Sequence, residues 1–274
     1  MDHDEEKKQK LPHGVALSWG LVKPSRRGPK RELSIEQIVD AAIVIADEQG
    51  LQAVSMNRVA SSLGFSTMSL YRYFQSKDDL ILLMQDAAAR DIPATSKEAG
   101  DDWRENMRAF VYANLEIYTA HLWFLETPIY SVPMTPNSLK FVDWALGGMR
   151  MLPINNAEKM SFILLLSSYA RACGIIKRDM IRANHAGTDT DTFSGKGYAK
   201  NLAKLVTPEH FPYLHSVVAS GVYTDEMEYE NDDVSDIGND FDFGLERILD
   251  GIDHYLTLRG FKEKGEKNRS HEDN

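Results

Sequence analysis

The chain has 274 residues, of which 43% are apolar and 26% are charged, and its formal net charge is −10 at pH 7. These proportions are typical of a soluble globular protein and exclude collagen, coiled coil and disorder as descriptions of the whole chain. The single cysteine, Cys173, excludes an intrachain disulfide and a cysteine-based zinc site, and the lack of a long uncharged apolar run or a signal segment predicts a cytoplasmic protein without a membrane partner.

Residues 1–33 precede the first periodic segment and contain prolines and glycines throughout, so we expect an extended N-terminal arm. Within it, LPHGVALSWG is more apolar than a tail requires, and Trp19 packs either on the body of the protein or on a partner. The arm ends in the basic run KPSRRGPKR. Four cations there either follow DNA into the minor groove or form a solubilising tail, namely Arg26, Arg27, Lys30 and Arg31.

The charge is distributed unevenly along the chain. Residues 23–77 carry eight basic residues against five acidic ones, a net charge of +3, which leaves −13 for the rest of the chain. A chain of this kind can approach a polyanion with its basic front end, although the whole molecule is acidic.

Helical signals begin at Ser34, which forms a capping box with Gln37, and apolar residues at helical spacing continue until Gly50 ends the helix. Two short helices are predicted in SMNRVASSLG and STMSLYRYF, each opening on a serine that can cap it. A fourth helix starts at Ser76. Because Gly64 can adopt the left-handed conformation that ends the first short helix, we expect a helix-turn-helix.

The second short helix has one anchoring face and one exposed face. At 100° per residue, Leu70 and Phe74 point in nearly the same direction and predict the anchors, while Met68 and Arg72 point the opposite way. A helix of this width fits the major groove, where Thr67, Met68, Ser69 and Arg72 can read bases. Tyr71, Tyr73, Lys77 and the helix start at Ser55 are better placed for phosphates. The alternative is an ordinary solvated face, but residues 66–77 contain no acidic residue.

Beyond Gly100 the pattern remains helical, with predicted helices at 102–125, 136–151, 156–184, 191–205, 208–220 and 242–258. We therefore expect an all-α protein. Its predicted parts are an arm (1–33), a helix-turn-helix domain (34–92), a helical body (93–260) and a flexible tail (261–274).

Aromatic residues are dense between residues 103 and 144, where they either line a pocket for a small hydrophobic or aromatic effector or form plain core. The candidate effector contacts are Trp103, Met107, Phe110, Tyr118, Trp123, Trp144 and Tyr169. The segment 156–184 is apolar on more than one side, which favours a homodimer interface over intrachain core alone. No metal-ligand spacing is present, and we expect no metal and no cofactor.

Residues Ser34 to Leu82 resemble the DNA-binding domain of the tetracycline-repressor (TetR) family of bacterial transcription regulators. The most specific part is Tyr71, Tyr73 and Phe74 followed by KDDL at 77–80. TPEHFPYL and FDFGLERILDGIDHYL resemble one branch of the C-terminal domains of that family. The resemblance implies a three-helix N-terminal domain and a larger helical bundle that dimerises and binds an effector. It also implies a DNA-binding set of Ser55, Arg58, Ser66, Thr67, Met68, Ser69, Tyr71, Arg72, Tyr73 and Lys77.

The expected function is a repressor that an effector releases from a double-stranded DNA operator, which we expect to be palindromic. One alternative is an enzyme acting on a small aromatic or hydrophobic molecule, and another is an effector-independent DNA-binding protein. The sequence has no phosphate-binding loop, nucleophile elbow or HExxH motif, and FSGKGYAK lacks the P-loop spacing. We therefore expect no catalysis.

Overall fold

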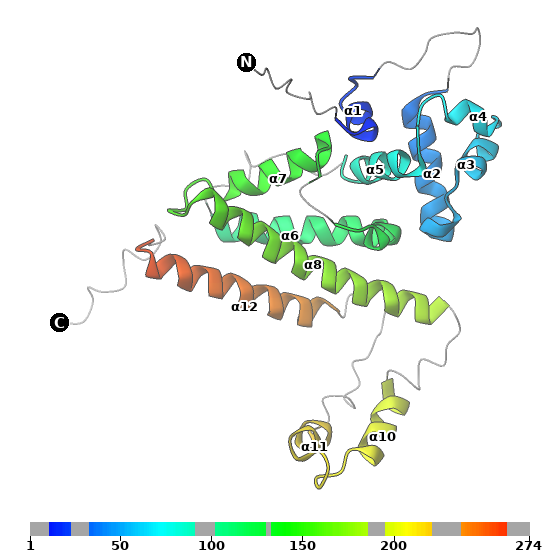
Figure 1. Cartoon of the computed structure of the whole chain (residues 1–274). Coiled ribbons are helices and arrows are strands. Elements are labelled where there is room, and N and C mark those ends of the chain that lie inside the picture. The colour runs from blue at the N-terminus through cyan, green and yellow to red at the C-terminus, as the bar shows by residue number, and fades with distance from the viewer. Residues whose placement is uncertain are drawn as a thin grey trace, which may run out of the picture. The chain divides into compact units, whose positions relative to one another are not determined.

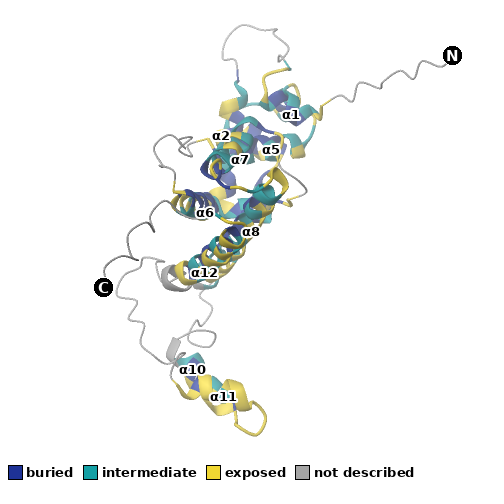
Figure 2. Cartoon of the chain, turned by 90° about the vertical axis from the view of Figure 1, so that its left-hand side faces the viewer, coloured by how far each residue is buried: buried dark blue, intermediate teal, exposed yellow. Residues whose placement is uncertain are grey.

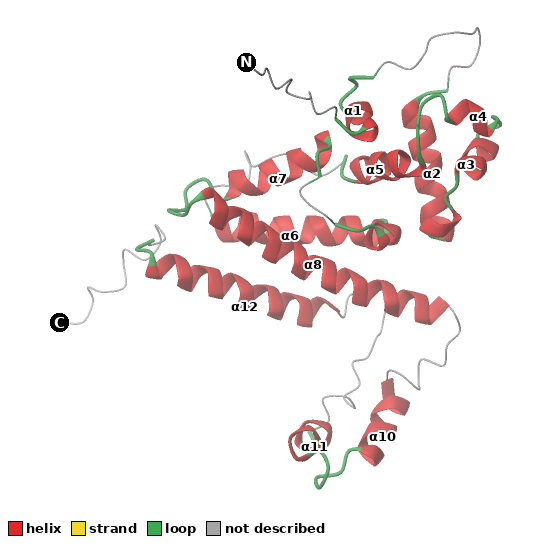
Figure 3. Ribbon diagram, in the orientation of Figure 1, coloured by secondary structure: helices red, strands yellow, loops and turns green. Residues whose placement is uncertain are grey.

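A computed structural model describes residues 11–22, 33–90, 102–129, 133–185, 195–220 and 237–261. Over these ranges all regular structure is helical, which confirms the predicted all-α class (Figures 1 and 3). The chain forms two compact units, one of residues 1–174 with 248–274 and the other of residues 175–247. The predicted tail beyond residue 261 lies outside the described residues.

The first unit contains most of the helices. They are α1 (His13–Ser18), α2 (Ile35–Gln49), η1 (Leu51–Ala53), α3 (Met56–Ser62), α4 (Thr67–Leu70), α5 (Lys77–Ala88), α6 (Trp103–Ala120), η2 (Leu122–Glu126) and α7 (Pro136–Gly148), with the first part of α8 (Asn156–His185) and the last part of α12 (Ile237–Leu258). The second unit holds the remainder of α8 and α12 with α10 (Gly195–Leu205) and α11 (Pro212–Ala219), which pack on each other. The segment predicted as one helix over 102–125 is broken at His121.

The first helices begin and end where the sequence indicates. The Ser34 hydroxyl accepts the Gln37 N–H while the Gln37 side chain accepts the Ser34 N–H, which is the predicted capping box. The Ser55 hydroxyl caps α3 by accepting the Arg58 N–H, without a reciprocal side-chain bond. Ser66 precedes α4 but its side chain makes no capping bond, because its hydroxyl lies 2.9 Å from the Ser69 hydroxyl. The prediction of a serine cap is therefore right for α3 and wrong for α4.

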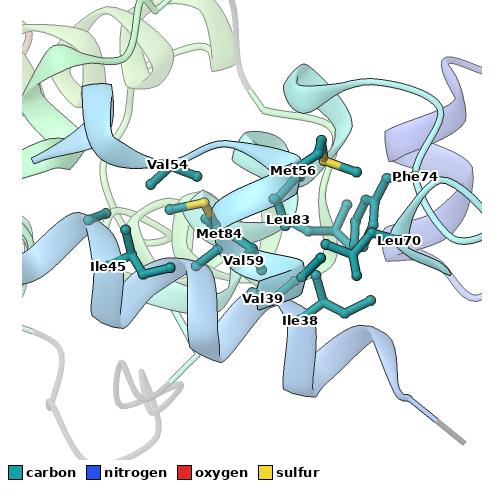
Figure 4. Packing of buried hydrophobic residues seen from close by; sticks show 14 of the residues in the cluster. Ile38, Val39, Ile45, Val54, Met56, Val59, Leu70, Phe74, Leu83 and Met84 are labelled. Carbon is teal, nitrogen blue, oxygen red and sulfur yellow. The ribbon is translucent and has the colours of Figure 1, made fainter. Parts of the chain in front are cut away.

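A single hydrophobic cluster joins α2, α3, α4 and α5. Figure 4 shows Ile38 and Val39 of α2, Val59 of α3, and Leu70 and Phe74 around α4 pointing toward one another. Gly64 has a φ of 75°, the left-handed conformation in which an L side chain is strained, so it turns the chain between α3 and α4. This turn places α4 across the cluster with one face buried and the other outside.

The N-terminal segment departs from the prediction of an extended arm. Residues His13–Ser18 form the helix α1, with Val15 and Leu17 buried, and α1 lies beside α5 (Figure 1). Pro12 stands at its N-cap, where a missing N–H costs nothing, and Gly20 ends it with a φ of 64°. Pro12 and Gly20 are start and stop signals that the sequence contains, but a helix of six residues is too short to show an apolar periodicity. The basic run at 23–31 lies outside the described residues.

The rest of the first unit is built on α6, α7 and α8. Gly148 of α7 lies so close to α6 that an added Cβ would stand 2.7 Å from the Asn106 Cβ. Phe110 of α6 stacks near Phe141 and Trp144 of α7, with ring centroids 4.8 and 6.2 Å from Phe110. Helix α8 is long and apolar enough over Asn156–Ala183 to cross a membrane by length and composition, a test that core helices of soluble proteins also pass.

Candidate functional site

The segment α4 and the turn after it present a mixed polar and apolar surface. Leu70 and Phe74 are fully buried, whereas Met68 is 73% and Tyr71 49% exposed, and Arg72 is exposed as well. The predicted anchors and exposed residues of this helix are thus confirmed. Helix α4 ends at Leu70, which is shorter than the helix predicted in STMSLYRYF, and residues 71–73 form a turn in which the Leu70 carbonyl oxygen accepts the Tyr73 and Phe74 N–H groups.

Neighbouring side chains hold the exposed face of α4 in place. The Thr67 hydroxyl donates to Asn57 Oδ1 at 3.0 Å, which connects α4 to α3. Arg58 of α3 donates to the Gln49 side chain at the end of α2. Tyr73 is half-buried and packs against the hydrophobic cluster, and Lys77 is half-buried at the start of α5. The predicted residues from Ser55 to Lys77 therefore gather around α3, α4 and the start of α5.

The start of α5 is fixed by a network around Asp79. Its backbone N–H donates to Ser76, the N-cap, at 3.1 Å. Its carboxylate accepts the Gln75 N–H at 3.0 Å and lies 2.8 Å from His13 Nδ1 of α1. A single acidic residue thus joins the turn after α4, the first turn of α5 and the N-terminal helix.

The C-terminal half of α5 is bonded to α7. The buried carboxylate of Asp86 accepts the backbone N–H groups of Asn137 and Ser138 at 2.8 and 3.3 Å, and the Asn137 side chain bonds to it as well. Asp86 therefore caps the first turn of α7 from a different helix, where the orphan N–H groups and the helix dipole favour a negative charge.

A second connection from α5 runs through Thr127. Gln85 donates to the Thr127 hydroxyl at 2.7 Å, and that hydroxyl donates to the Phe124 carbonyl oxygen. Arg171 of α8 donates through Nη2 to the carbonyl oxygens of Leu125 and Thr127, both at 2.8 Å. Helices α5 and α8 are thus joined by hydrogen bonds through a single short segment.

Both carbonyl bonds of Arg171 are made by Nη2. Its Nη1 is buried and has no hydrogen-bond partner among the described residues. Burial raises the pKa of the neighbouring Tyr118, and the charge of Arg171 and its hydrogen bond with the Tyr118 hydroxyl oppose that rise. The two side chains therefore place a neutral hydroxyl beside a cation that retains an unused donor.

The predicted effector contacts separate into different places. Phe110 and Trp144 share the aromatic cluster between α6 and α7, with Met107 and Trp103 buried on the same helix α6. Tyr118 lies by Arg171, and Tyr169 is half-buried on α8. Trp123 packs instead into the hydrophobic cluster of α2–α5 and donates to Asp47 at 2.7 Å.

Several residues of these networks were not predicted from the sequence. Asp79 belongs to the KDDL pattern at 77–80, which gives no role to its carboxylate, Asp86 has no signal of its own, and Arg171 is the one charge inside the apolar segment 160–176. That interruption was the only signal for Arg171, since a cation in an apolar helix requires partners. Within the described ranges, no three His, Cys, Asp or Glu side chains converge as a metal site, and burial raises the pKa of the Cys173 thiol.

Comparison with known proteins matches two family models to the chain. The model of bacterial regulatory proteins of the tetR family matches residues 38–84, and the model of the tetracyclin repressor-like C-terminal domain matches residues 95–256. Helix α1, with its bond to Asp79, lies outside both matches.

Curated relatives cover most of the chain. It is 30% identical over 247 residues to the HTH-type transcriptional repressor DrrR1 of Streptomyces coeruleorubidus, covering 89% of this chain and 86% of DrrR1. It is 34% identical over 234 residues to the HTH-type transcriptional repressor Rv1353c of Mycobacterium tuberculosis, covering 83% of this chain and 84% of the relative.

Among solved structures, the fold is similar to the Streptomyces coelicolor TetR family protein ActR in complex with actinorhodin. The TM-score is 0.66 at 22% identity, and the match covers 85% of this chain and all of ActR. ActR in complex with (S)-DNPA matches with a TM-score of 0.63 over the same share of this chain. At this identity the likeness concerns the fold.

Proposed function

The chain belongs to the tetR family of bacterial regulatory proteins, which are DNA-binding transcription regulators, and we propose that it is a repressor. In this proposal the α4 segment reads an operator and the helical body binds a small effector. The observation that carries the proposal is the geometry of α4. Two buried side chains, Leu70 and Phe74, fix a segment whose opposite face exposes Met68, Tyr71 and Arg72. As it acts on DNA, we place it in the cytoplasm.

The roles follow from the chemistry of each side chain. Arg72 donates two hydrogen bonds to guanine in the major groove, and Thr67 and Ser69 read neighbouring bases. Met68 offers an apolar contact to a thymine methyl group. Lys77, Tyr71, Tyr73 and the α3 start at Ser55 with Arg58 hold phosphates and set the register without reading sequence.

The effector site is proposed between α6, α7 and α8. It is supported by the aromatic cluster of Phe110 and Trp144 and by the unused Nη1 of Arg171 beside Tyr118. A guanidinium with a free donor favours an aromatic ligand that carries an oxygen acceptor such as a carboxylate. Two of the fold neighbours are structures of ActR bound to small molecules, actinorhodin and (S)-DNPA, which supports a body that binds a small molecule.

Release from DNA follows from the hydrogen bonds of Arg171. An effector that bonds to the unused Nη1 shifts the guanidinium, whose Nη2 holds the carbonyl oxygens of Leu125 and Thr127, and Thr127 is bonded to Gln85 of α5. Helix α5 follows directly after the DNA-reading segment, so its shift moves α4. The ligand then favours the arrangement that fits the operator less well, as a shift of population between two states.

The test is a selection of binding sites from randomised duplex DNA with the purified protein. We expect one enriched motif with two inverted halves separated by about one helical turn, because a dimer places two reading segments on one face of DNA. Recovery of no enriched sequence would contradict the proposal. A panel of aromatic acids and their neutral amides, added to the operator complex, then tests release by fluorescence anisotropy, and we expect the acids alone to lower the anisotropy.

A further inference from the structure

The N-terminal helix α1, which lies outside both family matches, contacts the start of α5 at one end and the segment before α7 at the other. At its start, His13 Nδ1 lies 2.8 Å from the Asp79 carboxylate, which also accepts the Gln75 N–H in the turn after α4. Just after its end, Trp19 Nε1 donates to the Met134 carbonyl oxygen at 2.8 Å, two residues before α7 begins.

Helix α1 is held firmly enough to transmit a displacement between these places. Its end is closed by two hydrogen bonds, from the Gly20 N–H to the Leu17 carbonyl and from the Leu21 N–H to the Ala16 carbonyl. Leu17 is buried and belongs to the hydrophobic cluster of α2–α5. These contacts fix the last turn of α1 and the residues that follow it against the cluster.

Helix α1 packs so closely on α5 that there is no space for a side chain at Gly14. An added Cβ on Gly14 would lie 2.9 Å from Asp79 Oδ1 and 3.1 Å from the Asp79 Cα. The second of these is backbone and cannot turn aside. A glycine at this position allows α1 to pack directly on the first turn of α5, which is a requirement of close approach rather than of backbone conformation.

Two carboxylates on α5 define how that helix is held. Asp79 and Asp86 are seven residues apart, so they lie on the same face of α5 and about 10 Å from each other along its axis. Asp86 binds the first turn of α7 directly. That contact holds the C-terminal half of α5 against α7, while the first turn of α5 packs in the hydrophobic cluster through Leu80. The route from Asp79 through His13, α1 and Trp19 to Met134 provides a second attachment to the segment that opens α7.

We propose that α1 is a strut that fixes the tilt of α5 against the start of α7, with His13 and Trp19 as positioning residues for the DNA-reading segment. A displacement at the start of α7 then reaches the turn at Gln75 through α1 as well as through α5. The strut adds to the DNA-binding function and rests on it only for its consequence at the operator.

The test uses hydrogen exchange of the full-length protein and the variant Trp19→Phe, which keeps an aromatic side chain and removes the N–H donor. Trp19 is 48% exposed, so the variant is expected to fold. Without DNA, we expect exchange in the peptide that contains the Gln75 amide to speed up by about threefold or more, because the far end of the strut is released. Peptides of α2 serve as the internal reference and should not change. An unchanged Gln75 peptide would overturn the proposal and leave α1 as static packing.

The matched control is Leu21→Ala, two residues further along the same segment and 66% exposed. We expect it to exchange like the unaltered protein. Gly14→Ala provides a second variant, because its methyl group must displace α1 from Asp79, and it should speed exchange at Gln75 like Trp19→Phe. If Gly14→Ala and Leu21→Ala give the same exchange, the strut is also excluded.

A second arm adds saturating operator duplex and measures the peptide of residues 133–140. Coupling is reciprocal, so DNA bound at α4 should slow exchange there by about fivefold in the unaltered protein and by less than about twofold in Trp19→Phe. If the unaltered protein binds no DNA, the proposed function is contradicted, but the exchange rates measured without DNA still test the strut. Equal slowing in both proteins would show that Asp86 alone carries the coupling and would overturn the strut.

Discussion

Arg72 and Lys77 are both cations beside α4, but their positions give them different tasks. Arg72 is exposed on the face opposite Leu70, while Lys77 is half-buried at the start of α5. A planar guanidinium reads guanine through two hydrogen bonds, whereas an ammonium near a helix start neutralises a phosphate. One residue is therefore expected to determine sequence preference and the other general affinity.

We predict that Arg72→Ala costs about 1 to 3 kcal/mol of operator binding and relaxes the preference at one base pair. Lys77→Ala should weaken all sequences alike and lower the slope of binding against salt by about one. Fluorescence anisotropy with the selected operator and with single-base variants, at several salt concentrations, separates the two effects. An Arg72→Ala protein that selects the same motif would contradict the role of Arg72.

Asp86 combines two helix ends in one carboxylate. It stands in the last turn of α5, where a negative charge opposes the helix dipole, and it is 8% exposed. The N–H groups at the start of α7 compensate for both disadvantages. The position is therefore stable only because two helices meet there.

Asp86→Ala is expected to lower the free energy of unfolding by about 1 to 2 kcal/mol, as for the loss of a capping residue. Urea denaturation followed by circular dichroism measures the change. The control is Asp78→Ala, an exposed acid at the start of the same helix, which should lie within about 0.5 kcal/mol of the unaltered protein. Equal losses in the two variants would argue against the cap.

At the scale of elements, α8 and α12 are joined by a charged network at the end of the first unit. Glu158 in the first turn of α8 accepts from the Tyr255 hydroxyl and, at 2.7 Å, from Arg259 Nη2. The Tyr255 hydrogen bond, the Asn155 N–H and the charge of Arg259 lower the pKa of Glu158 from its ordinary value of 4.5. The same hydrogen bond raises the pKa of Tyr255.

The lowered pKa of Glu158 determines how the stability of the fold depends on pH. A carboxylate whose pKa is lower in the folded state stabilises the fold above its ordinary pKa and loses that contribution as the pH falls toward the folded value. Glu158→Gln should therefore be less stable than the unaltered protein at neutral pH, and the difference should narrow as the pH falls below about 4.5. Urea denaturation across this range tests it, with the exposed Glu116→Gln as control. A constant difference at all pH values would contradict the shift.

The starts of several helices and their buried faces were predictable from the sequence. Helix starts at Ser34, Ser55 and Ser76 were predictable because capping depends on residues three positions apart. The buried faces followed from periodicity for the same reason. Helix α1 escaped prediction because a helix of six residues completes fewer than two turns, and its buried side chains are ordered by α5 rather than by their own spacing.

For the whole molecule, the local residues of the reading surface were predictable but the connections between its parts were not. Met68 and Leu70 share α4, and Phe74 follows it within four residues, so their directions follow from local geometry. The sequence separation is 66 residues for His13 and Asp79 and 51 residues for Asp86 and Asn137. Only the fold brings these pairs together. The predicted base and phosphate contacts remain predictions until DNA is bound.

The first unit leaves an apolar stripe uncovered on α8. Ser161, Leu164, Leu165, Ser168 and Ala172 are exposed at spacings of three and four residues, and Figure 2 shows exposed residues along both α8 and α12. Leu164 is 67% exposed. On α12, the exposed Gly251 has open space where a Cβ would stand. Small and apolar residues of this kind allow helices of a second copy to approach closely, so we propose that this surface forms the homodimer.

Leu164→Glu should convert the dimer into a monomer, because each interface would bury two carboxylates that have no partner. Light scattering after size exclusion measures the mass directly. Leu21→Glu is a matched control, since Leu21 is 66% exposed but lies outside α8, and it should remain dimeric. A monomer has one reading segment and is expected to lose about half of the binding free energy for a two-half operator while keeping its helical content. A dimeric Leu164→Glu protein would place the interface elsewhere on the molecule.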